Sequence, residues 1–202
     1  MSIERDYINS ISPSECVEVA KKEGAVLLRG FVSPEDQAEV EKEVMAHDLT
    51  PVDRSGYTIP EQFEDIGWEF SEAPPAVLAL GKRVCELVQP SVPEWGVNQA
   101  RAQLYSPGEA GIEWHRDYKH DLRMIAVASL MGVARFDIRL RQGEVSWQLR
   151  PGDLVLMRGT LLNGRKDDRP RHRVFAPETG KRLSVAYRQV ANEAPDLESS
   201  DE

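Results

Sequence analysis

The sequence predicts an α+β fold in which a double-sheet jelly roll carries N-terminal helices packed on its outside. Helix-start signals and helical apolar spacing dominate residues 1–98, whereas residues 99–191 read as short alternating strands separated by turns. We therefore expect one domain over residues 1–191. In it, residues 1–98 supply helical and substrate-facing elements, and residues 99–191 form the jelly-roll core.

Three helices are expected in the first part of the chain. Ser12-Pro13 and Ser33-Pro34 each place an N-cap residue before a proline at the first helical position, and Gly24 ends the first helix. Residues 25–29 form a short apolar strand between these two helices. The third helix runs from about Pro75 to Val88.

The strand pattern begins near residue 99. Residues 136–141 and 145–150 each alternate apolar and polar side chains, and Gln142-Gly143 supplies the turn between them. The last strand covers residues 182–190. By contrast, residues 50–72 show no clean period, and we expect them to be irregular.

Charge and composition limit the kinds of partner and the cellular location that the sequence predicts. The net charge is −9, and more than half of it lies in residues 192–202, which hold five acids and no base. We expect this segment to be a disordered, solvating tail. No stretch is long enough to span a bilayer, no export signal opens the chain, and Cys16 and Cys85 do not indicate a disulfide framework. These observations favour a cytoplasmic protein without a membrane partner, and they indicate no protein partner.

The strongest chemical signal is the segment Trp114-His115-Arg116-Asp117. On an extended strand, residues two apart point to the same face, so His115 and Asp117 are placed to bind one metal. His172 opens a later strand and is the favoured third ligand, with His120 as a competitor and His47 as a surface residue. Two imidazoles and one carboxylate form the ligand set of non-haem Fe(II) oxygenases, which keep positions open for O2 and a co-substrate.

A second signal lies in the strand from Arg182 to Arg188. Leu183, Val185 and Tyr187 share one face, whereas both arginines lie on the other with Ser184 and Ala186. A buried guanidinium is costly unless it meets an anion, and a dicarboxylate would satisfy both arginines. An edge strand with solvent-facing arginines explains the same pattern, and both interpretations stay open at this point.

These segments together resemble the AlkB-like family of Fe(II)/2-oxoglutarate-dependent dioxygenases. The resemblance covers residues 99–190 in order. Gln103-x-Tyr105-x-x-Gly108 is similar to the family's Asn-x-Tyr-x-x-Gly, and the H-x-D segment and His172 follow it. The matching pieces farther along the chain are the apolar strand 125–132, Leu149-x-Pro151-Gly152-Asp153 continuing to Met157-x-Gly159, and Arg182 to Arg188, which resembles R-x-N-x-T-x-R.

The resemblance implies a double-stranded β-helix and an Fe(II) ion held by His115, Asp117 and His172. It implies that Arg182 pairs with the distal carboxylate of 2-oxoglutarate and that Tyr105 donates a hydrogen bond to that co-substrate. Arg188 would lie near the iron-chelating end and the substrate, and Gln103 would replace the family's Asn. Because Ser184 and Ala186 replace Asn and Thr, the resemblance supports the metal and co-substrate more strongly than the substrate.

The family's usual reaction implies O2-dependent hydroxylation or demethylation of an N-alkylated base in DNA or RNA. Trp68 or Tyr57 would stack on a flipped base, or would instead seal the helix–barrel interface. A basic run could follow phosphates or be a solvated loop: Arg158, Arg165, Lys166, Arg169, Arg171 and Arg173. A small-molecule or protein side-chain substrate, a zinc hydrolase on the same scaffold and a non-catalytic jelly-roll binding module are the alternatives.

Overall fold

The computed structural model describes residues 4–6, 13–54, 56, 61–164, 167–193 and 195. Its helices are α1 (Pro13–Glu23), α2 (Pro34–Val44) and α3 (Pro75–Val88), with a 3-10 turn, η1, at Phe70–Glu72. Its strands are β1 (Glu4–Asp6), β2 (Ala25–Arg29), β3 (Thr50–Asp53), β4 (Glu61–Glu69), β5 (Gln99–Tyr105), β6 (Gly111–His115), β7 (Asp121–Met131), β8 (Ala134–Leu140), β9 (Gly143–Leu149), β10 (Leu154–Arg158), β11 (His172–Val174) and β12 (Arg182–Val190).

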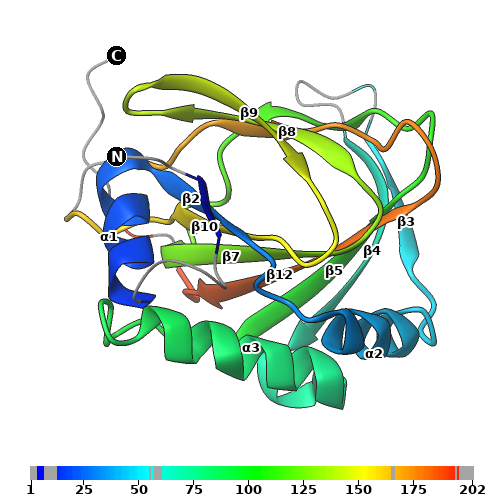
Figure 1. The fold of residues 1–202 in the computed structure, drawn as a ribbon, viewed down its shortest axis with the longest axis horizontal. Helices are drawn as coiled ribbons and strands as arrows, with labels where there is room; N and C mark the ends of the chain where they lie inside the picture. Colours follow the sequence, from blue (N-terminus) through cyan, green and yellow to red (C-terminus); the bar gives the residue numbers. More distant parts are fainter. Residues whose placement is uncertain are drawn as a thin grey trace.

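The strands form one continuous sheet that curls into a half-barrel, as the jelly-roll prediction required. Their order is β1-β2-β10-β7-β12-β5-β4-β6-β11-β8-β9, and β3 extends from β4. In Figure 1 the β8–β9 hairpin lies over the strands β7, β12 and β5, with the barrel interior between them. Strands far apart in the sequence therefore face one another across a single interior.

The helices cover the outer face of the larger half of the sheet (Figure 1). Apolar residues of α3, including Val77, Leu80 and Val84, are buried there. Tyr187 of β12 donates a hydrogen bond from its hydroxyl to the Val77 carbonyl at 3.0 Å. Gly81 is required at this crossing, because a Cβ would overlap the ring of Phe70. This packing fixes which face of β12 points toward the helices and which points into the barrel.

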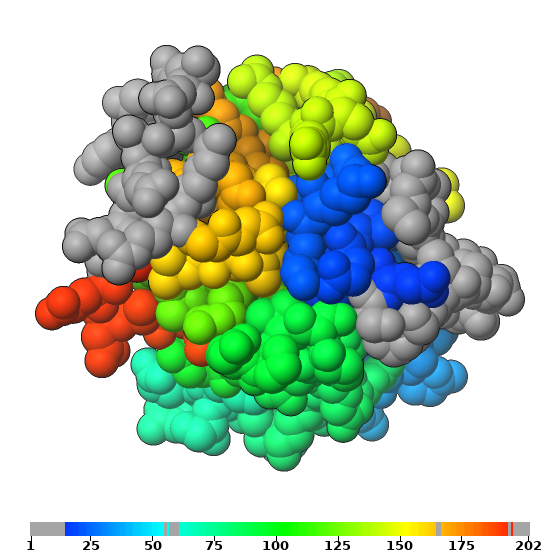
Figure 2. Space-filling model, turned by 90° about the vertical axis from the view of Figure 1, so that its left-hand side faces the viewer, coloured from blue at the N-terminus to red at the C-terminus, as the bar shows by residue number. Residues whose placement is uncertain are grey.

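Helix α1 closes one end of the molecule, where Figure 2 shows it beside α3, the β8–β9 hairpin and the segment after β10. Main-chain hydrogen bonds join it to those parts: Arg141 donates to the Glu23 carbonyl and Arg158 to the Gly24 carbonyl. Gly24 ends α1 with φ at +114°, a conformation that favours glycine. The predicted stop of this helix is therefore confirmed, whereas its predicted N-cap, Ser12, lies outside the described residues.

The prediction that residues 50–72 are irregular was wrong. Thr50–Asp53 and Glu61–Glu69 form paired strands, and β4 also pairs with β5 and β6. Both faces of β4 are partly covered: Phe63 and Asp65 are buried on one face, while Ile66 and Trp68 pack against the core on the other. A strand covered on both faces and rich in acids lacks the alternation that marks a half-exposed strand.

Several predictions on the strands are confirmed. The β8–β9 hairpin pairs Phe136 with Trp147, whose rings stack with centroids 6.1 Å apart, and Leu140 with Gly143 at the turn. Strand β12 lies between β5 and β7, so it is not an edge strand. The sheet draws β2 and β4 from the first 98 residues, so that part supplies strands as well as helices.

Two further predictions concern the C-terminal tail and membrane-spanning helices. The predicted disordered tail at 192–202 lies almost wholly outside the described residues. None of the helices in the described part of the chain has the length and apolar character needed to cross a bilayer.

Candidate functional site

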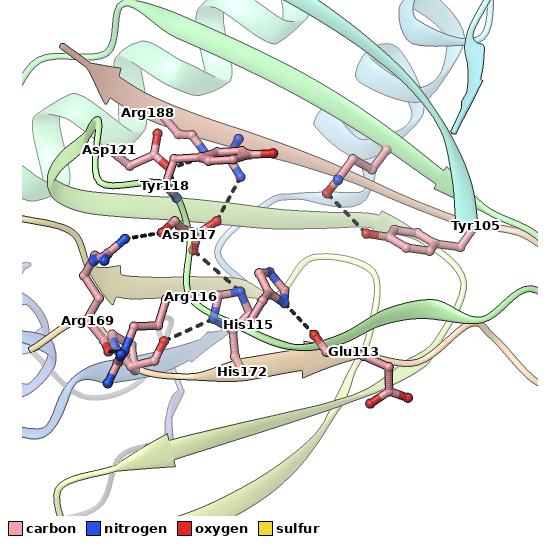
Figure 3. A network of polar contacts seen from close by, with 12 residues as sticks. Tyr105, Glu113, His115, Arg116, Asp117, Tyr118, Asp121, Arg169, His172 and Arg188 are labelled. Carbon is pink, nitrogen blue, oxygen red and sulfur yellow. Dashed lines mark hydrogen bonds and ion pairs between the residues drawn. The ribbon is translucent and has the colours of Figure 1, made fainter. Parts of the chain in front are cut away.

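His115, Asp117 and His172 meet inside the curled sheet (Figure 3). One ligand atom from each lies within 4.8 Å of the other two. His115 ends β6 and His172 begins β11, and these residues are directly paired across the two strands. Asp117 follows in the loop after β6, and its Oδ2 lies 3.5 Å from Nε2 of His172. Two imidazole nitrogens and a carboxylate oxygen at this spacing fit one divalent transition-metal ion.

Hydrogen bonds orient both imidazoles for a metal. Nδ1 of His115 donates to the Glu113 carbonyl at 2.7 Å, and Nδ1 of His172 lies 3.4 Å from the Pro170 carbonyl. A carbonyl only accepts, so these contacts place the protons on Nδ1 and leave the Nε2 lone pairs available. Phe136 stacks on His172 with centroids 5.4 Å apart and fixes the ring plane.

The electrostatic environment keeps His172 and Asp117 in forms that can bind a metal. Burial lowers the pKa of His172 to about 4, so the ring is neutral near pH 7. Burial alone would raise the pKa of Asp117, but His172, Arg188 and His115 together hold it below its usual value. His172 is therefore a neutral imidazole and Asp117 an ionised carboxylate before any metal binds, and these are the forms in which both can act as ligands.

Two arginines and one acid position Asp117. Arg169 donates to its main-chain carbonyl, and Arg188 donates from Nη2 to Oδ1 at 3.2 Å. The Arg188 contact leaves Oδ2 turned toward His172. Asp121, which is 2% exposed, accepts from the Tyr118 main-chain N–H at 3.1 Å and lies 3.9 Å from Nε of Arg188. Side chains from β7, β12 and the segment before β11 thus hold the loop after β6 in place.

Arg182 is a buried cation without a matching anion. It is 1% exposed, and its hydrogen-bond partners are hydroxyls: Ser184 at 3.3 Å, Ser129 at 3.5 Å and the phenol of Tyr105. Its Nε has no hydrogen-bond partner, and within the described residues no carboxylate lies within ion-pair distance of it. Burial lowers its pKa, which expresses the cost of holding this charge out of water. A buried guanidinium in this state fits an anionic ligand that is itself not part of the chain.

The same cavity links Arg182 to the metal ligands. Its lining includes His115, Asp117, His172, Tyr105 and Arg182. Tyr105 lies under Arg182, with the guanidinium carbon 5.2 Å from the ring centre, and its hydroxyl donates to Oε1 of Gln103 at 3.2 Å. Burial raises the pKa of Tyr105 to about 12, so the phenol stays protonated. Arg182 and the His115–Asp117–His172 cluster thus line one cavity.

A wider hollow of 360 Å³ opens beside the metal ligands. Apolar side chains such as Phe63 and Ile112 form part of its wall, and Arg101, Tyr118 and Arg188 form another part. Sequence reasoning missed Phe63, Arg101 and Tyr118. Two signals could have found them: Arg101 shares a strand face with Gln103, and Tyr118 directly follows a metal ligand.

The structure does not bring the other candidate residues to this site. Trp68 and Phe63 lie five positions apart on β4 and so point to opposite faces, which turns Trp68 toward the helices. His47 packs against Trp68 with ring centroids 5.7 Å apart, and His120 is not among the clustered ligands. Trp68 therefore seals the helix–barrel interface, the plainer of the two predictions made for it. Tyr57 lies outside the described residues.

The described residues of the basic run are engaged in contacts within the protein and do not form an open track for phosphates. Arg158 pairs with Asp168 at 3.3 Å, Arg169 with Asp167 at 2.7 Å, and Arg173 with Asp137 at 2.7 Å. Arg171 donates to the Trp114 carbonyl at 3.3 Å. Arg165 and Lys166 lie outside the described residues. These contacts indicate that the described arginines of this run stabilise the fold.

Comparison with known proteins returns similar structures but no family. No family profile matches the chain, and no curated protein sequence matches it. A 2OG-Fe(II) oxygenase-family oxidoreductase from Burkholderia pseudomallei is similar over 97% of this chain and 98% of its own, at 12% identity and a TM-score of 0.70. The chain has the fold of these oxygenases.

Two more solved structures share the fold. A prolyl-4-hydroxylase from Pseudomonas putida is 18% identical over 89% of this chain and 99% of its own, with a TM-score of 0.66. The 2-oxoglutarate complex of a dioxygenase for auxin oxidation from Arabidopsis thaliana is 17% identical over 98% and 96%, with a TM-score of 0.65. None of these three is described as acting on nucleic acid, so the AlkB-like resemblance rests on the sequence motifs alone.

Proposed function

We propose that this protein is an Fe(II)- and 2-oxoglutarate-dependent oxygenase that oxidises a C–H bond of an organic substrate. The observation that carries the proposal is the joint presence, in one cavity, of the His115–Asp117–His172 cluster and the buried cation of Arg182, which has no ion-pair partner among the described residues. A zinc hydrolase would use the cluster but not the cation, and a binding module would need neither.

Each residue has a defined task in this proposal. His115, Asp117 and His172 would hold the iron, and Arg182 would bind the far carboxylate of 2-oxoglutarate through its forked donors. Tyr105 and Gln103 would supply hydrogen bonds along the co-substrate, and Arg188 would keep Asp117 oriented. When bound, iron and 2-oxoglutarate activate O2, with succinate and CO2 as co-products and one oxygen atom delivered to the substrate.

The AlkB-like assignment is a finer step of the same proposal. It is supported by the ordered motifs over residues 99–190 and implies demethylation of an N-alkylated base. The internal pairing of the basic run and the net charge of −9 weaken a polynucleotide substrate, because both disfavour a phosphate backbone.

The test is an anaerobic titration of metal-free protein with Fe(II) and 2-oxoglutarate, followed by the visible charge-transfer band of the chelate. We expect a band in wild type, none in His115→Ala, and a band needing far more 2-oxoglutarate in Arg182→Ala. His120→Ala, which changes a nearby histidine outside the cluster, should leave the band unchanged. A folded, iron-loaded protein without the band would refute the proposal, and stoichiometric zinc instead of iron would favour the hydrolase.

A further inference from the structure

Three residues outside the expected co-substrate pocket mark where the substrate binds. Arg101, Tyr118 and Arg188 each line both the 360 Å³ hollow and a second hollow of 230 Å³ next to it. They therefore form the junction between the two spaces, next to the metal ligand Asp117. Figure 3 shows the ring of Tyr118 beside Arg188 and Asp121.

The two arginines project from neighbouring strands toward the same side. Arg101 of β5 pairs with Ala186 of β12, and Arg188 lies two residues farther along β12. Residues paired across strands share a face, as do residues two apart on one strand, so both guanidiniums enter the barrel. Diagonal neighbours of this kind are close enough for two long side chains to bind one group between them.

Both guanidiniums keep donors that the described part of the chain does not use. Arg101 directs Nε and Nη2 to the same oxygen of Asp65, which leaves Nη1 without a hydrogen-bond partner among the described residues. Arg188 uses Nη2 for Asp117, and its buried Nε makes no hydrogen bond. Unused donors on two adjacent arginines suit an oxyanion, above all a carboxylate.

Tyr118 adds a flat apolar surface to this junction. It is 59% exposed, which is unusual for a large aromatic side chain beside a buried metal site. Isolated exposed aromatics need no explanation, but this one borders two hollows and directly follows a metal ligand. Together with the apolar wall at Phe63, it suits a planar body rather than a flexible chain.

From these observations we propose that the substrate is a small planar organic acid, with its carboxylate on Arg101 and Arg188 and its ring on Tyr118. This inference rests on the proposed oxygenase function and names the substrate class for it. A nucleotide within DNA or RNA would present the same planar and anionic chemistry from a polymer. The acidic chain and the internally paired basic run favour the free acid.

The test uses 2-naphthoate and its neutral analogue 2-naphthamide as probes of protein loaded with Fe(II) and 2-oxoglutarate without O2. Binding is measured by calorimetry, and the chelate band is recorded in every sample. We expect wild type to bind the acid about tenfold or more tightly than the amide, as one charge-assisted contact of roughly 1.5–3 kcal/mol requires. Tyr118→Ala should weaken binding of both probes.

Arg101 is tested by a pair of variants. Arg101→Gln leaves Asp65 buried without its partner, so the double variant Arg101→Gln/Asp65→Asn removes both charges and protects the fold. Both should lose the preference for acid over amide, and Arg101→Lys should keep part of it. Arg139→Gln, which changes an exposed arginine that lines neither hollow, should keep all of it. In all of them the affinity for 2-oxoglutarate should stay within about twofold of wild type.

The outcomes separate this inference from the proposed function. If the band forms but the acid and the amide bind equally, or neither binds, the substrate class is wrong while the oxygenase proposal stands. The same holds if a short N-methylated oligonucleotide binds and 2-naphthoate does not. If no band forms in the folded protein, the proposed function itself fails.

Discussion

Replacing Arg182 with methionine should weaken 2-oxoglutarate binding and at the same time leave the metal-free, ligand-free protein as stable as before or more so. Arg182 is 1% exposed and, within the described residues, meets hydroxyls and no carboxylate. A buried charge without an ionic partner costs several kcal/mol, and methionine fills a similar volume without that cost. We expect the free energy of unfolding to be unchanged or higher by about 1–4 kcal/mol.

The same substitution should be unfavourable for binding of the co-substrate. Two charge-assisted hydrogen bonds from the fork of Arg182 would contribute roughly 3–6 kcal/mol, so their loss should raise the Kd of 2-oxoglutarate by about 10²–10⁴-fold. In wild type, 2-oxoglutarate at 100 times its Kd should add about 2.7 kcal/mol of stability and raise Tm by roughly 5–10 °C. At the same concentration the Arg182→Met protein should show almost no shift.

Thermal melts of metal-loaded and metal-free protein, with and without 2-oxoglutarate, measure both effects. Arg158→Met is the matched control, because Arg158 is half-buried and paired with Asp168 at 3.3 Å. This variant should lose about 1–3 kcal/mol without changing the Tm shift caused by 2-oxoglutarate. The reasoning fails if Arg182→Met instead loses about 3–5 kcal/mol, since a loss of that size means that a buried ion pair was broken.

Three further predictions concern the titration of His172, the close contact at Gly111 and the position of Trp68. Because the pKa of His172 is lowered to about 4 in the fold against 6.5 unfolded, the unfolded state binds more protons between these values. This histidine should therefore make metal-free protein less stable as the pH falls from 6.5 to 4. Asp121, whose pKa is raised to about 6, has the opposite effect on stability over this range. The contribution of His172 is therefore measured as the difference in unfolding free energy between wild type and His172→Gln in urea melts. Gly111→Ala should cost more than about 3 kcal/mol and release metal, since φ is +68° and a Cβ would overlap the carbonyl of Val174, which ends the strand that His172 begins. Circular dichroism and metal analysis would check this. Trp68→Leu should leave the chelate band and the Kd of 2-oxoglutarate unchanged, and a loss of substrate binding in that variant would restore Trp68 to the site.

The cluster of His115, Asp117 and His172 could be predicted from sequence because much of its geometry is local. His115 and Asp117 are two apart at the end of a strand, and the choice of His172 over His120 followed from its position at the start of a strand. The β12 arginines could be assigned to one face by the same alternation. Whether that face was exposed could not be decided, since one strand's sequence does not say how many neighbours it has. The pairing of β12 with both β5 and β7 answers this.

The residues proposed to bind the substrate could not be predicted from the sequence, for a different physical reason. Arg101 and Tyr118 are seventeen positions apart, and they meet only because β5, β12 and the loop after β6 converge in the curled sheet. The β3–β4 hairpin that carries Phe63 escaped detection because β4 is covered on both faces. Contacts of this kind depend on topology, which no short motif encodes.

Because side chains alternate along the central strands, the residues that stabilise the fold lie on one face and the residues proposed to bind ligands lie on the other. On β12, Leu183, Val185 and Tyr187 are each 0% exposed and pack toward the helices, so one face alone supplies the apolar contacts. The other face carries Arg182 and Arg188, whose burial costs free energy that no ion pair within the described residues offsets for Arg182. A fold selected for stability alone would place apolar side chains at such a position on a central strand. The cation is retained, we infer, because an anion offsets its cost when the site is filled.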